Sequence, residues 1–374
     1  SIVLYRIRSR HVELETVRRV GKELLSKLPW QEVADSPTVR YYTDWSKFEG
    51  YVPVYNVEVE RRAGLCEVVV AGGVDVGSCR GVEVREGGDV FKYLSISSRI
   101  LALHASALSR AVYVRVVGAL ERPLVIRLLG YAPAGGHVAS HVVLEVEREA
   151  SGSVVVVAES GAGVMHTAVV EGVLRGGVEY VLVSKAAGPQ YLHSSLEVYS
   201  EARARPLVTG GVMNTVREEY IIGERAAVEV VGLELGVGDS RIDHLVSVVN
   251  VGREGRGYAK LIGVARDKSF VTQRAVGKIA KTGVMSDNAV EGVIYIAGEG
   301  AVANTQPVIL VETGEVAGAR HSAADASLDE EKEFFLRARG VPKSEIPTLL
   351  ITSLVDQYLS SLSDSAREVV SEIL

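Results

Sequence analysis

The spacing of apolar residues divides the chain into a long central region and two shorter flanks. Between about residues 99 and 320, short Val-rich runs such as HVVLEVE, SVVVVAE and VEYVLVS recur at intervals of about ten to twelve residues. Gly, Asp, Asn, Ser or Arg separates nearly every pair of runs, and no helical period survives for more than a turn. Short apolar runs bounded by turn-forming residues are typical of β-strands, so we expect this region to be entirely β.

Two observations favour the stacked coils of a β-helix for this region. The dipeptides Asn-Gly and Asp-Gly, which most often form the turns of antiparallel hairpins, do not occur in the chain. The series of evenly spaced short strands is also long for one β-sandwich. In a β-helix each strand pairs with the coils above and below, and turn residues occupy the corners. The residues alone leave a sandwich or barrel open as alternatives.

Helical periodicity appears only in the flanks. Near the N-terminus, apolar residues from Val12 to Leu28 are three or four apart, and Pro29 ends that pattern. Strand-like runs at 66–71 and 82–84 follow. We therefore expect a small mixed α/β region.

The C-terminal flank predicts three short helices. Ser327 and Glu330 form an S-x-x-E capping box for a helix over LDEEKEFFLRAR. Two further helices are expected after Ser344, with Pro347 in the first turn, and near Ser363. The expected domains are thus an N-terminal α/β region (1–98), a β core (99–325) and a C-terminal helical domain (326–374).

Composition and charge exclude several classes of protein. The 374 residues are 47% hydrophobic, which excludes a disordered chain. With 41 basic and 47 acidic residues the net charge is −6, which argues against a general nucleic-acid binder. No apolar run is long enough for a signal peptide or a membrane span, so we expect a cytoplasmic location and no membrane partner. Two cysteines, Cys66 and Cys79, are too few for a disulfide framework or a cysteine-rich metal site.

Two short motifs resemble catalytic or cofactor-binding sequences but occur in an unsuitable context. GSCRG, at 77–81, imitates a nucleophile elbow with Cys79 as nucleophile, but a strand-like run follows where the elbow requires a helix. AGEGAVA, at 297–303, contains a GxGxxA string, but another strand follows it instead of the helix of a dinucleotide site. We interpret both as turns.

The histidines were considered as metal ligands. His137 and His141, in HVASH, would share one face of a strand but lie too far apart to bind one ion without bending. Four further histidines lie singly in β-like sequence and are interpreted as hydrogen-bonded core or surface residues: His104, His166, His193 and His244. His321 differs, because it lies at the junction between the last β-run and the first C-terminal helix, where ligands and partners often meet a scaffold. A structural histidine is the alternative there.

One segment carries a specific resemblance. HSAADASLDEEKEFFLRARGV resembles the C-terminal signature of the SufB/SufD family, the scaffold proteins of the SUF iron–sulfur cluster assembly system. NTQPVILVE, LALHASAL and IDHLVSVVN resemble further family segments, so that the match covers about residues 101–362. The positions that carry the signature are His321, Ala323, Leu328, Asp329, Glu330, Phe334, Leu336, Arg339 and Gly340.

The resemblance implies a fold, partners and site residues. It implies a right-handed parallel β-helix with a helical C-terminal domain. It also implies a SufC-type ATPase docked on the helical tail, and a SufB/SufD-type chain, identical or different, paired through the β-helix. His321 would lie at that pairing interface as a candidate iron ligand, with a transient iron ion or iron–sulfur cluster there and no tightly bound cofactor. The candidates for partner binding, some of which alternatively pack against the protein's own body, are Phe334, Phe335, Arg339, Gly340, Leu349, Leu350 and Leu354.

Two departures from the family pattern favour a SufD-like role. SufB chains carry a cysteine late in the β-helix, whereas both cysteines here precede the β core. SufB also has Glu after the tail histidine, where this chain has Ser322. The resulting hypothesis is a non-catalytic SufD-like scaffold subunit. The alternatives are a β-helix carbohydrate-active enzyme and a purely structural β-helix protein.

Overall fold

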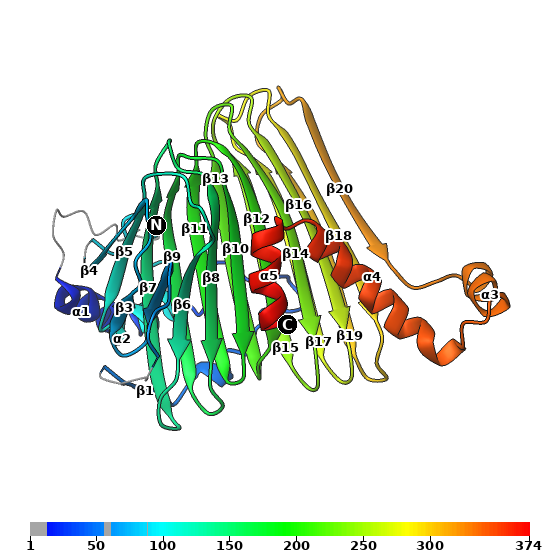
Figure 1. Ribbon diagram of the computed structural model, residues 1–374, viewed down its shortest axis with the longest axis horizontal. Coiled ribbons are helices and arrows are strands. Elements are labelled where there is room, and N and C mark those ends of the chain that lie inside the picture. The colour runs from blue at the N-terminus through cyan, green and yellow to red at the C-terminus, as the bar shows by residue number, and fades with distance from the viewer. Residues whose placement is uncertain (1–12, 56–60, 88) are drawn as a thin grey trace.

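The computed structural model describes residues 13–55, 61–87 and 89–374. It is mainly β, with 47% of the residues in strands, and the strands form a β-solenoid of about seven turns (Figure 1). This confirms the β-helix expected from the spacing of the Val-rich runs and from the family resemblance.

From β5 onwards, consecutive strands alternate between two sheets, so that each coil contributes one strand to each. All pairings from β5 to β20 are parallel. Sheet A contains, in spatial order, β19 (Val302–Val311), β17 (Phe270–Ile279), β15 (Arg241–Asn250), β13 (Met213–Ile222), β11 (Pro189–Val198), β9 (Met165–Leu174), β7 (Gly136–Val146), β5 (Ala111–Val116) and β4 (Val82–Glu86), with β1 (Val52–Pro53) beside β7. Sheet B contains β20 (Gly318–Asp325), β18 (Asp287–Ile296), β16 (Arg256–Ala265), β14 (Ala227–Gly236), β12 (Glu201–Gly210), β10 (Val178–Ala186), β8 (Gly152–Ser160), β6 (Leu124–Gly130), β2 (Glu67–Val70) and β3 (Val74–Val76).

The core is the space between the two sheets, which we call the bore. Successive side chains of a strand point to opposite faces, so alternate residues of every strand enter the bore. Val142 and Leu144 of β7 and Val154 and Val156 of β8 belong to one apolar cluster there, and all four are fully buried. Other parts of this chain also cover outer-face residues of both sheets, and parallel strands buried on both faces have nearly continuous runs of Val, Leu and Ile.

The outer face of sheet A is covered by the N-terminal region. Here α1 (Leu14–Leu24) packs on α2 (Arg99–Ala107), and η1 (Trp45–Phe48) lies in the same apolar cluster. A Cβ at Gly21 would lie 2.6 Å from the backbone nitrogen of Ser106, so glycine permits the close approach of the two helices. The helix ends earlier than the predicted Leu28, and Val12 lies outside the described residues.

The outer face of sheet B is covered by the last two of the C-terminal helices, α4 (Ile346–Ser360) and α5 (Asp364–Ile373). They are preceded by α3 (Glu330–Ala338) and η2 (Lys343–Glu345). Pro347 lies in the first turn of α4 and Ser363 caps α5, both as predicted. The cap of α3 differs: Asp329, not Ser327, accepts from the backbone N–H of Lys332, at 2.8 Å.

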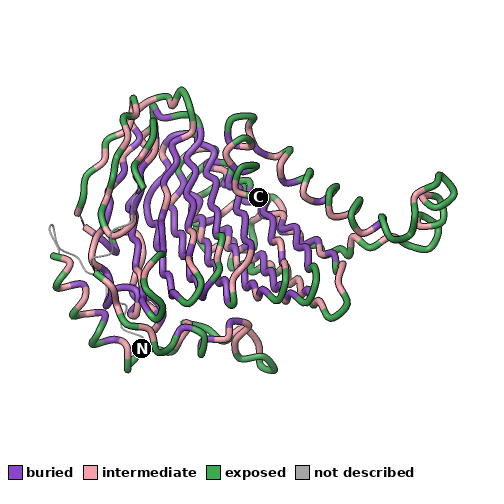
Figure 2. Tube along the Cα trace, turned by 60° about the horizontal axis from the view of Figure 1, so that its bottom comes forward, coloured by how far each residue is buried: buried purple, intermediate pink, exposed green. Residues whose placement is uncertain are grey.

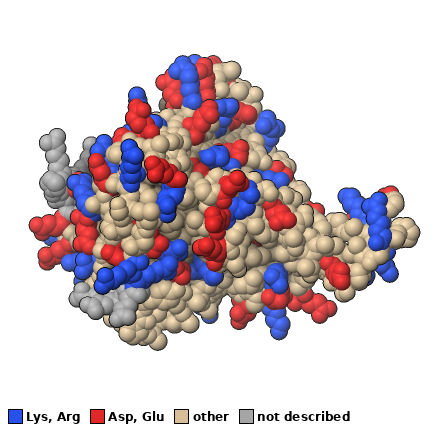
Figure 3. Space-filling view, in the orientation of Figure 1, with Lys and Arg blue, Asp and Glu red and all other residues tan. Residues whose placement is uncertain are grey.

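The views show how the tail and the charges are distributed. Helices α4 and α5 lie across the strands of sheet B, whereas α3 projects beyond the solenoid and is exposed (Figure 2). Basic and acidic side chains are interspersed on the face of the solenoid drawn in Figure 3. Within the described ranges, no helix has the length and apolar character needed to cross a membrane.

Candidate functional site

The C-terminal end of the solenoid is open. Strands β19 and β20 form the last coil, and each has a neighbour on one side only among the described residues. Every residue of β20 after Gly318 is exposed, as are Val308 and Leu310 of β19. An edge strand presents unpaired N–H and C=O groups that can pair with a strand of another chain. The open end is therefore a surface suited to strand pairing.

His321 lies on this last coil. Its strand β20 pairs with β18 so that His321 is opposite Val290, a core residue that is 2% exposed. The register therefore places His321 on the bore side of the sheet, together with Ala323 and Asp325. Because no further coil covers it, His321 is exposed. The imidazole is accessible to a partner or a metal ion at the place where the bore reaches the surface.

The tail that follows β20 exposes apolar side chains. Phe334 and Phe335 of α3 are 67% and 52% exposed, and their rings contact each other edge to face, with centroids 6.2 Å apart. Gly340 ends the helix with φ +87°, a conformation that favours glycine, and Arg339 beside it is exposed. Leu349 of α4 is also exposed. These five residues remain available to a partner.

Two of the seven candidates for partner binding pack against the protein itself. Leu354 is buried and Leu350 is partly buried, both in the apolar cluster between α4 and sheet B. Polar contacts fix the same helices, since the hydroxyl of Tyr358 donates to the carbonyl of Arg205 at 3.0 Å. Helix α4 thus has an inner face held on the solenoid and an outer face that is free.

A chain of hydrogen-bonded polar side chains runs through the bore towards the open end. His244 contacts Glu218 through Nε2 and Glu234 through Nδ1, the latter at 2.6 Å. Gln273 Nε2 donates to Glu234 at 2.9 Å, and the hydroxyl of Thr305, on β19, donates to Gln273 Oε1 at 2.7 Å. The chain thus connects the middle of the solenoid with its last coil.

Electrostatics make His244 a cation in this chain. Burial lowers the pKa of His244, but the hydrogen bonds that its ring donates to Glu218 and Glu234, together with the negative charges of these carboxylates, outweigh burial and raise the pKa to about 9. All three side chains are fully buried. Buried charges of this kind are retained only when they are paired, and here one imidazolium lies between two carboxylates.

A second polar cluster fixes α2 on the outer face of sheet A. Glu171 accepts from His141 Nε2 at 2.6 Å, and His141 Nδ1 lies 3.0 Å from His104 Nε2. The Glu171 carboxylate accepts from Nε2–H of His141, and one proton lies between Nδ1 of His141 and Nε2 of His104. Thr167 joins this chain to His137, at 2.9 Å from His104 and 2.7 Å from His137. Burial, followed by the neighbouring histidines, holds the pKa of His104 well below its usual value.

An ion network ties the N-terminal segment to the strands near the open end. Asp243 of β15 accepts from Arg217 at 2.8 Å and from Arg274 at 2.9 Å, and Arg274 also pairs with Asp35. The hydroxyl of Thr43 donates to Asp243 at 2.7 Å. Burial opposes the charge of Asp243, but the two arginines and Thr43 hold its pKa below the usual range.

The structure also resolves the status of the short motifs. Cys79, in GSCRG, forms a disulfide bond with Cys66, with the Cα atoms 4.4 Å apart, so it offers no nucleophilic thiol. The segment is a turn, as interpreted, but the bond itself was not foreseen. AGEGAVA is also a corner, between β18 and β19. His137 and His141 lie on one strand and are hydrogen bonded, and no group of three His, Cys, Asp or Glu in the described part of the chain is arranged to hold a metal ion.

The charged networks are the features that sequence reasoning missed. One sequence signal could have found them. A charged or polar residue replaces an apolar residue at a core-facing position of a Val-rich run, as His244 does in IDHLVSVVN. The histidines described as single are in fact joined in networks, with His104 on a helix and not on a strand.

Comparison with known proteins identifies a family model and several relatives. The model described as SUF system FeS cluster assembly, SufBD core domain, matches residues 131–354, which is more than half of the chain. The chain is 23% identical over 128 residues to the iron–sulfur cluster assembly protein SufD of Bacillus subtilis, covering 34% of this chain and 29% of that protein. It is 29% identical over 154 residues to a SufBD family protein of Pyrococcus horikoshii, covering 41% and 33%.

A third relative matches a shorter segment. An iron–sulfur cluster assembly SufBD family protein of Mycobacterium tuberculosis is 32% identical over 65 residues, which is 17% of this chain and 16% of the relative. The chain thus aligns with a third or less of the length of these curated relatives.

Proposed function

The chain belongs to the SufBD core domain family of the SUF iron–sulfur cluster assembly system, and from this premise we propose that it is a non-catalytic, SufD-like scaffold subunit acting in the cytoplasm. It pairs through the open end of its β-solenoid with a SufB/SufD-type chain, which is a second copy or a different chain. It docks a SufC-type ATPase through its helical tail. The match to a relative named SufD supports the subunit type.

The observation that carries this proposal is the position of two unsatisfied surfaces at the same end of the molecule. Among the described residues strand β20 has one unpaired edge, and the chain continues from β20 into α3 with its exposed Phe334 and Phe335. Exposed edges and exposed aromatic pairs are costly features that soluble proteins usually cover with a partner. A movement of the ATPase on the tail would be transmitted to the neighbouring strand-pairing surface.

The cluster under construction is the cargo of this assembly, and His321 is the residue of this chain proposed to meet it. A neutral imidazole is a suitable ligand for iron, and His321 is exposed on the last coil. Thiolates, the usual cluster ligands, would come from the partner, because both cysteines of this chain are joined in a disulfide at the opposite end. This division of roles favours a supporting subunit over one that holds the cluster alone.

Co-purification tests the proposal against its two alternatives. The untagged Walker-type ATPase of the same SUF system, co-expressed with the tagged chain, should elute with it in stoichiometric amount. A carbohydrate-active enzyme or a purely structural β-helix protein would elute without the ATPase, and that result would overturn the assignment.

Matched variants locate the two surfaces. Phe334→Ala with Phe335→Ala should remove most of the ATPase from the eluate, whereas Val212→Ala, at an equally exposed apolar residue in the turn between β12 and β13, should not. His321→Ala should leave folding and ATPase binding intact and lower the yield of cluster in the reconstituted complex. An unchanged cluster yield would remove the role proposed for His321.

A further inference from the structure

The two ends of the solenoid are built differently. At the C-terminal end both sheets stop at parallel strands, whose outer edges are free in the part of the chain that the structure describes. At the N-terminal end each sheet is finished by an antiparallel strand: β3 pairs with β2 in sheet B, and β4 pairs with β5 in sheet A. We call the segment that contains β2, β3 and β4 (residues 66–86) the N-terminal cap.

The N-terminal cap closes the bore as well as the sheet edges. Val74, Cys79, Val82 and Val84 pack against the core cluster at this end. The outward positions of the cap carry charges instead, such as Glu83, which pairs with Arg115 at 3.4 Å. Charged side chains on an edge strand oppose the addition of another strand. The cap is therefore a seal against the strand pairing that the opposite end permits.

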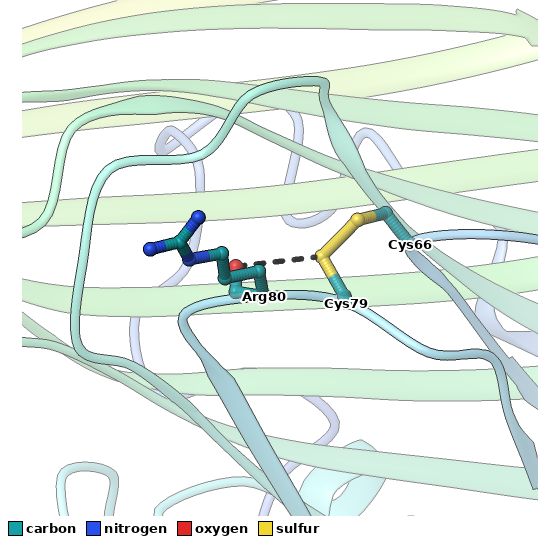
Figure 4. The surroundings of a disulfide bond; sticks show 3 residues. All are labelled: Cys66, Cys79 and Arg80. Carbon is teal, nitrogen blue, oxygen red and sulfur yellow. Dashed lines mark hydrogen bonds between the residues drawn. A yellow bond between two sulfur atoms is a disulfide. The ribbon is translucent and has the colours of Figure 1, made fainter.

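One covalent bond holds the N-terminal cap together. Cys66 comes directly before β2, and its carbonyl accepts from the N–H of Val125 in β6 at 2.9 Å. Cys79 lies in the segment that connects β3 to β4, so its bond to Cys66 joins the part of the cap on sheet B to the part on sheet A (Figure 4). The strands themselves are short, with three residues in β3 and five in β4.

We propose that the Cys66–Cys79 disulfide locks the N-terminal cap over a second strand-pairing surface, formed by β5 and β6, whose occupant after reduction is the open end of another copy of this chain. The proposal rests on the strand pairing at the open end that the proposed function assumes. While the bond is intact, each molecule has one pairing end, and assembly stops at a closed pair.

The fit of the second copy follows from the geometry of the solenoid. Strands β19 and β20 end the same two parallel sheets that β5 and β6 begin, so one copy stacked on another continues both sheets with the same strand direction. Such a head-to-tail contact joins two different surfaces and does not close, so it propagates into a chain of molecules. A contact between two open ends is self-complementary and closes at two.

The chemistry needs a thiol as reductant. The thiolate of a small dithiol or of a dithiol protein attacks Sγ of Cys79, which is more exposed than the buried Cys66. The S–S bond breaks, a mixed disulfide forms on Cys79, and Cys66 leaves as a thiolate that takes a proton. The second thiol of the reductant displaces Cys79, so that two cysteine thiols and one oxidised reductant are the products.

The test compares the mass distribution of the full-length chain, without the ATPase, before and after treatment with dithiothreitol. We expect single molecules and pairs in the oxidised protein, and a series of larger assemblies at regular mass increments after reduction. Amide hydrogen exchange should show that residues 67–86 lose protection in the same step. The double variant Cys66→Ser/Cys79→Ser should form the series without reductant and should not respond to it.

A control variant confirms which surfaces meet. Adding Leu310→Lys and Ala323→Lys, which place charges on the open end, to the cysteine-free variant should abolish the larger assemblies. An unchanged mass distribution after reduction, with or without loss of protection in the cap, would overturn the proposal. Failure of the proposed function is a separate result, since in that case the co-expressed ATPase does not elute with the chain, whatever the mass distribution after reduction.

Discussion

Inside the bore, Nδ1 of His244 lies 2.6 Å from Oε1 of Glu234, and the other ring nitrogen contacts Glu218. The three side chains come from β13, β14 and β15, so this contact joins both sheets across the core. From Glu234 the series of hydrogen bonds continues through Gln273 to Thr305 in the last coil.

The pairing of His244 predicts a loss of stability at high pH. The pKa of His244 is raised to about 9 in the folded protein, above its ordinary value of about 6.5. A group whose pKa is higher in the folded protein stabilises the fold, and this stabilisation is complete at pH values below the pKa of the unfolded state. It is lost as the pH rises through about 9. We expect the free energy of unfolding to fall by on the order of 3 kcal/mol between about pH 6 and pH 10.

Urea unfolding at the two pH values measures this effect. Glu234→Gln removes one carboxylate, so it should lower the pKa of His244 and weaken the dependence on pH. His321→Asn, at an exposed histidine, should leave the dependence unchanged. A wild-type profile as flat as that of Glu234→Gln would show that the triad is not charged as described.

Removal of Asp243 should be among the most destabilising single changes. Asp243→Ala leaves Arg217 without its partner and Arg274 with Asp35 alone, both in buried positions. Breaking a buried ion pair in this way costs about 3–5 kcal/mol. The free energy of unfolding from a denaturant titration gives the value.

The matched control is an exposed pair of similar geometry. Glu201 pairs with Arg256 at 3.1 Å, but both side chains are largely exposed. Glu201→Ala should therefore cost less than about 1 kcal/mol. Equal effects at Asp243 and Glu201 would contradict the role given to burial.

The hydrogen bonds of Glu145 predict that the stability of the fold decreases in acid. Burial alone would raise its pKa, but hydrogen bonds from Tyr113, Lys92 and Tyr93, at 2.6, 2.9 and 2.7 Å, lower the pKa to about 2. A carboxyl group whose pKa is lower in the folded protein stabilises the fold at pH values above its unfolded-state pKa of about 4.5. This stabilisation is lost as the pH falls through about 2. Glu145→Gln should lower the thermal midpoint at pH 7, with a difference from wild type that shrinks towards pH 2.

The acid series has its own control. Glu312 pairs with Lys278 at 3.3 Å on the surface, so Glu312→Gln should leave the thermal midpoint nearly unchanged at every pH. A constant difference between Glu145→Gln and wild type across the series would mean that the carboxylate is not held ionised by its three donors.

Gly292 predicts a strict size limit in the bore near the open end. A Cβ there would lie 1.9 Å from Oγ1 of Thr305 and 2.6 Å from Oε1 of Gln273. Gly292→Ala must displace both side chains, and we expect a loss of about 1–3 kcal/mol in the free energy of unfolding. Gly314→Ala, where a Cβ would meet nothing within 4 Å, should be nearly neutral. Similar stability of the two variants would contradict the packing described around Thr305.

The fold was largely predictable because the physical signal is local. Val-rich runs at even spacing follow from strands that are buried on both faces, and the corner glycines follow from the turns between them. Pro347 and Ser363 fixed the starts of two helices through capping rules that act over a few residues. His321 was expected at the junction between the last β-run and the first C-terminal helix, whereas the structure places it inside one more strand, β20.

The networks were not predictable because their partners are remote in sequence. Asp35 and Arg274 form a pair across 239 positions, and His104 meets His141 only because α2 lies on β7. The register of the coils decides such contacts, and the spacing of apolar runs does not fix that register. The disulfide joins residues only 13 positions apart, and it was missed because Cys66 and Cys79 become neighbours only when the hairpin of β2 and β3 forms.

The central claim is that this chain is a scaffold subunit with a pairing end and an ATPase-docking tail. Measuring the native mass of the complex purified with the ATPase of its SUF system tests this claim most directly. The account predicts a complex containing two β-solenoid chains and bound ATPase, which loses the ATPase when Phe334 and Phe335 are replaced by Ala. A single chain of this protein without ATPase, under conditions where the ATPase is abundant and folded, would contradict it.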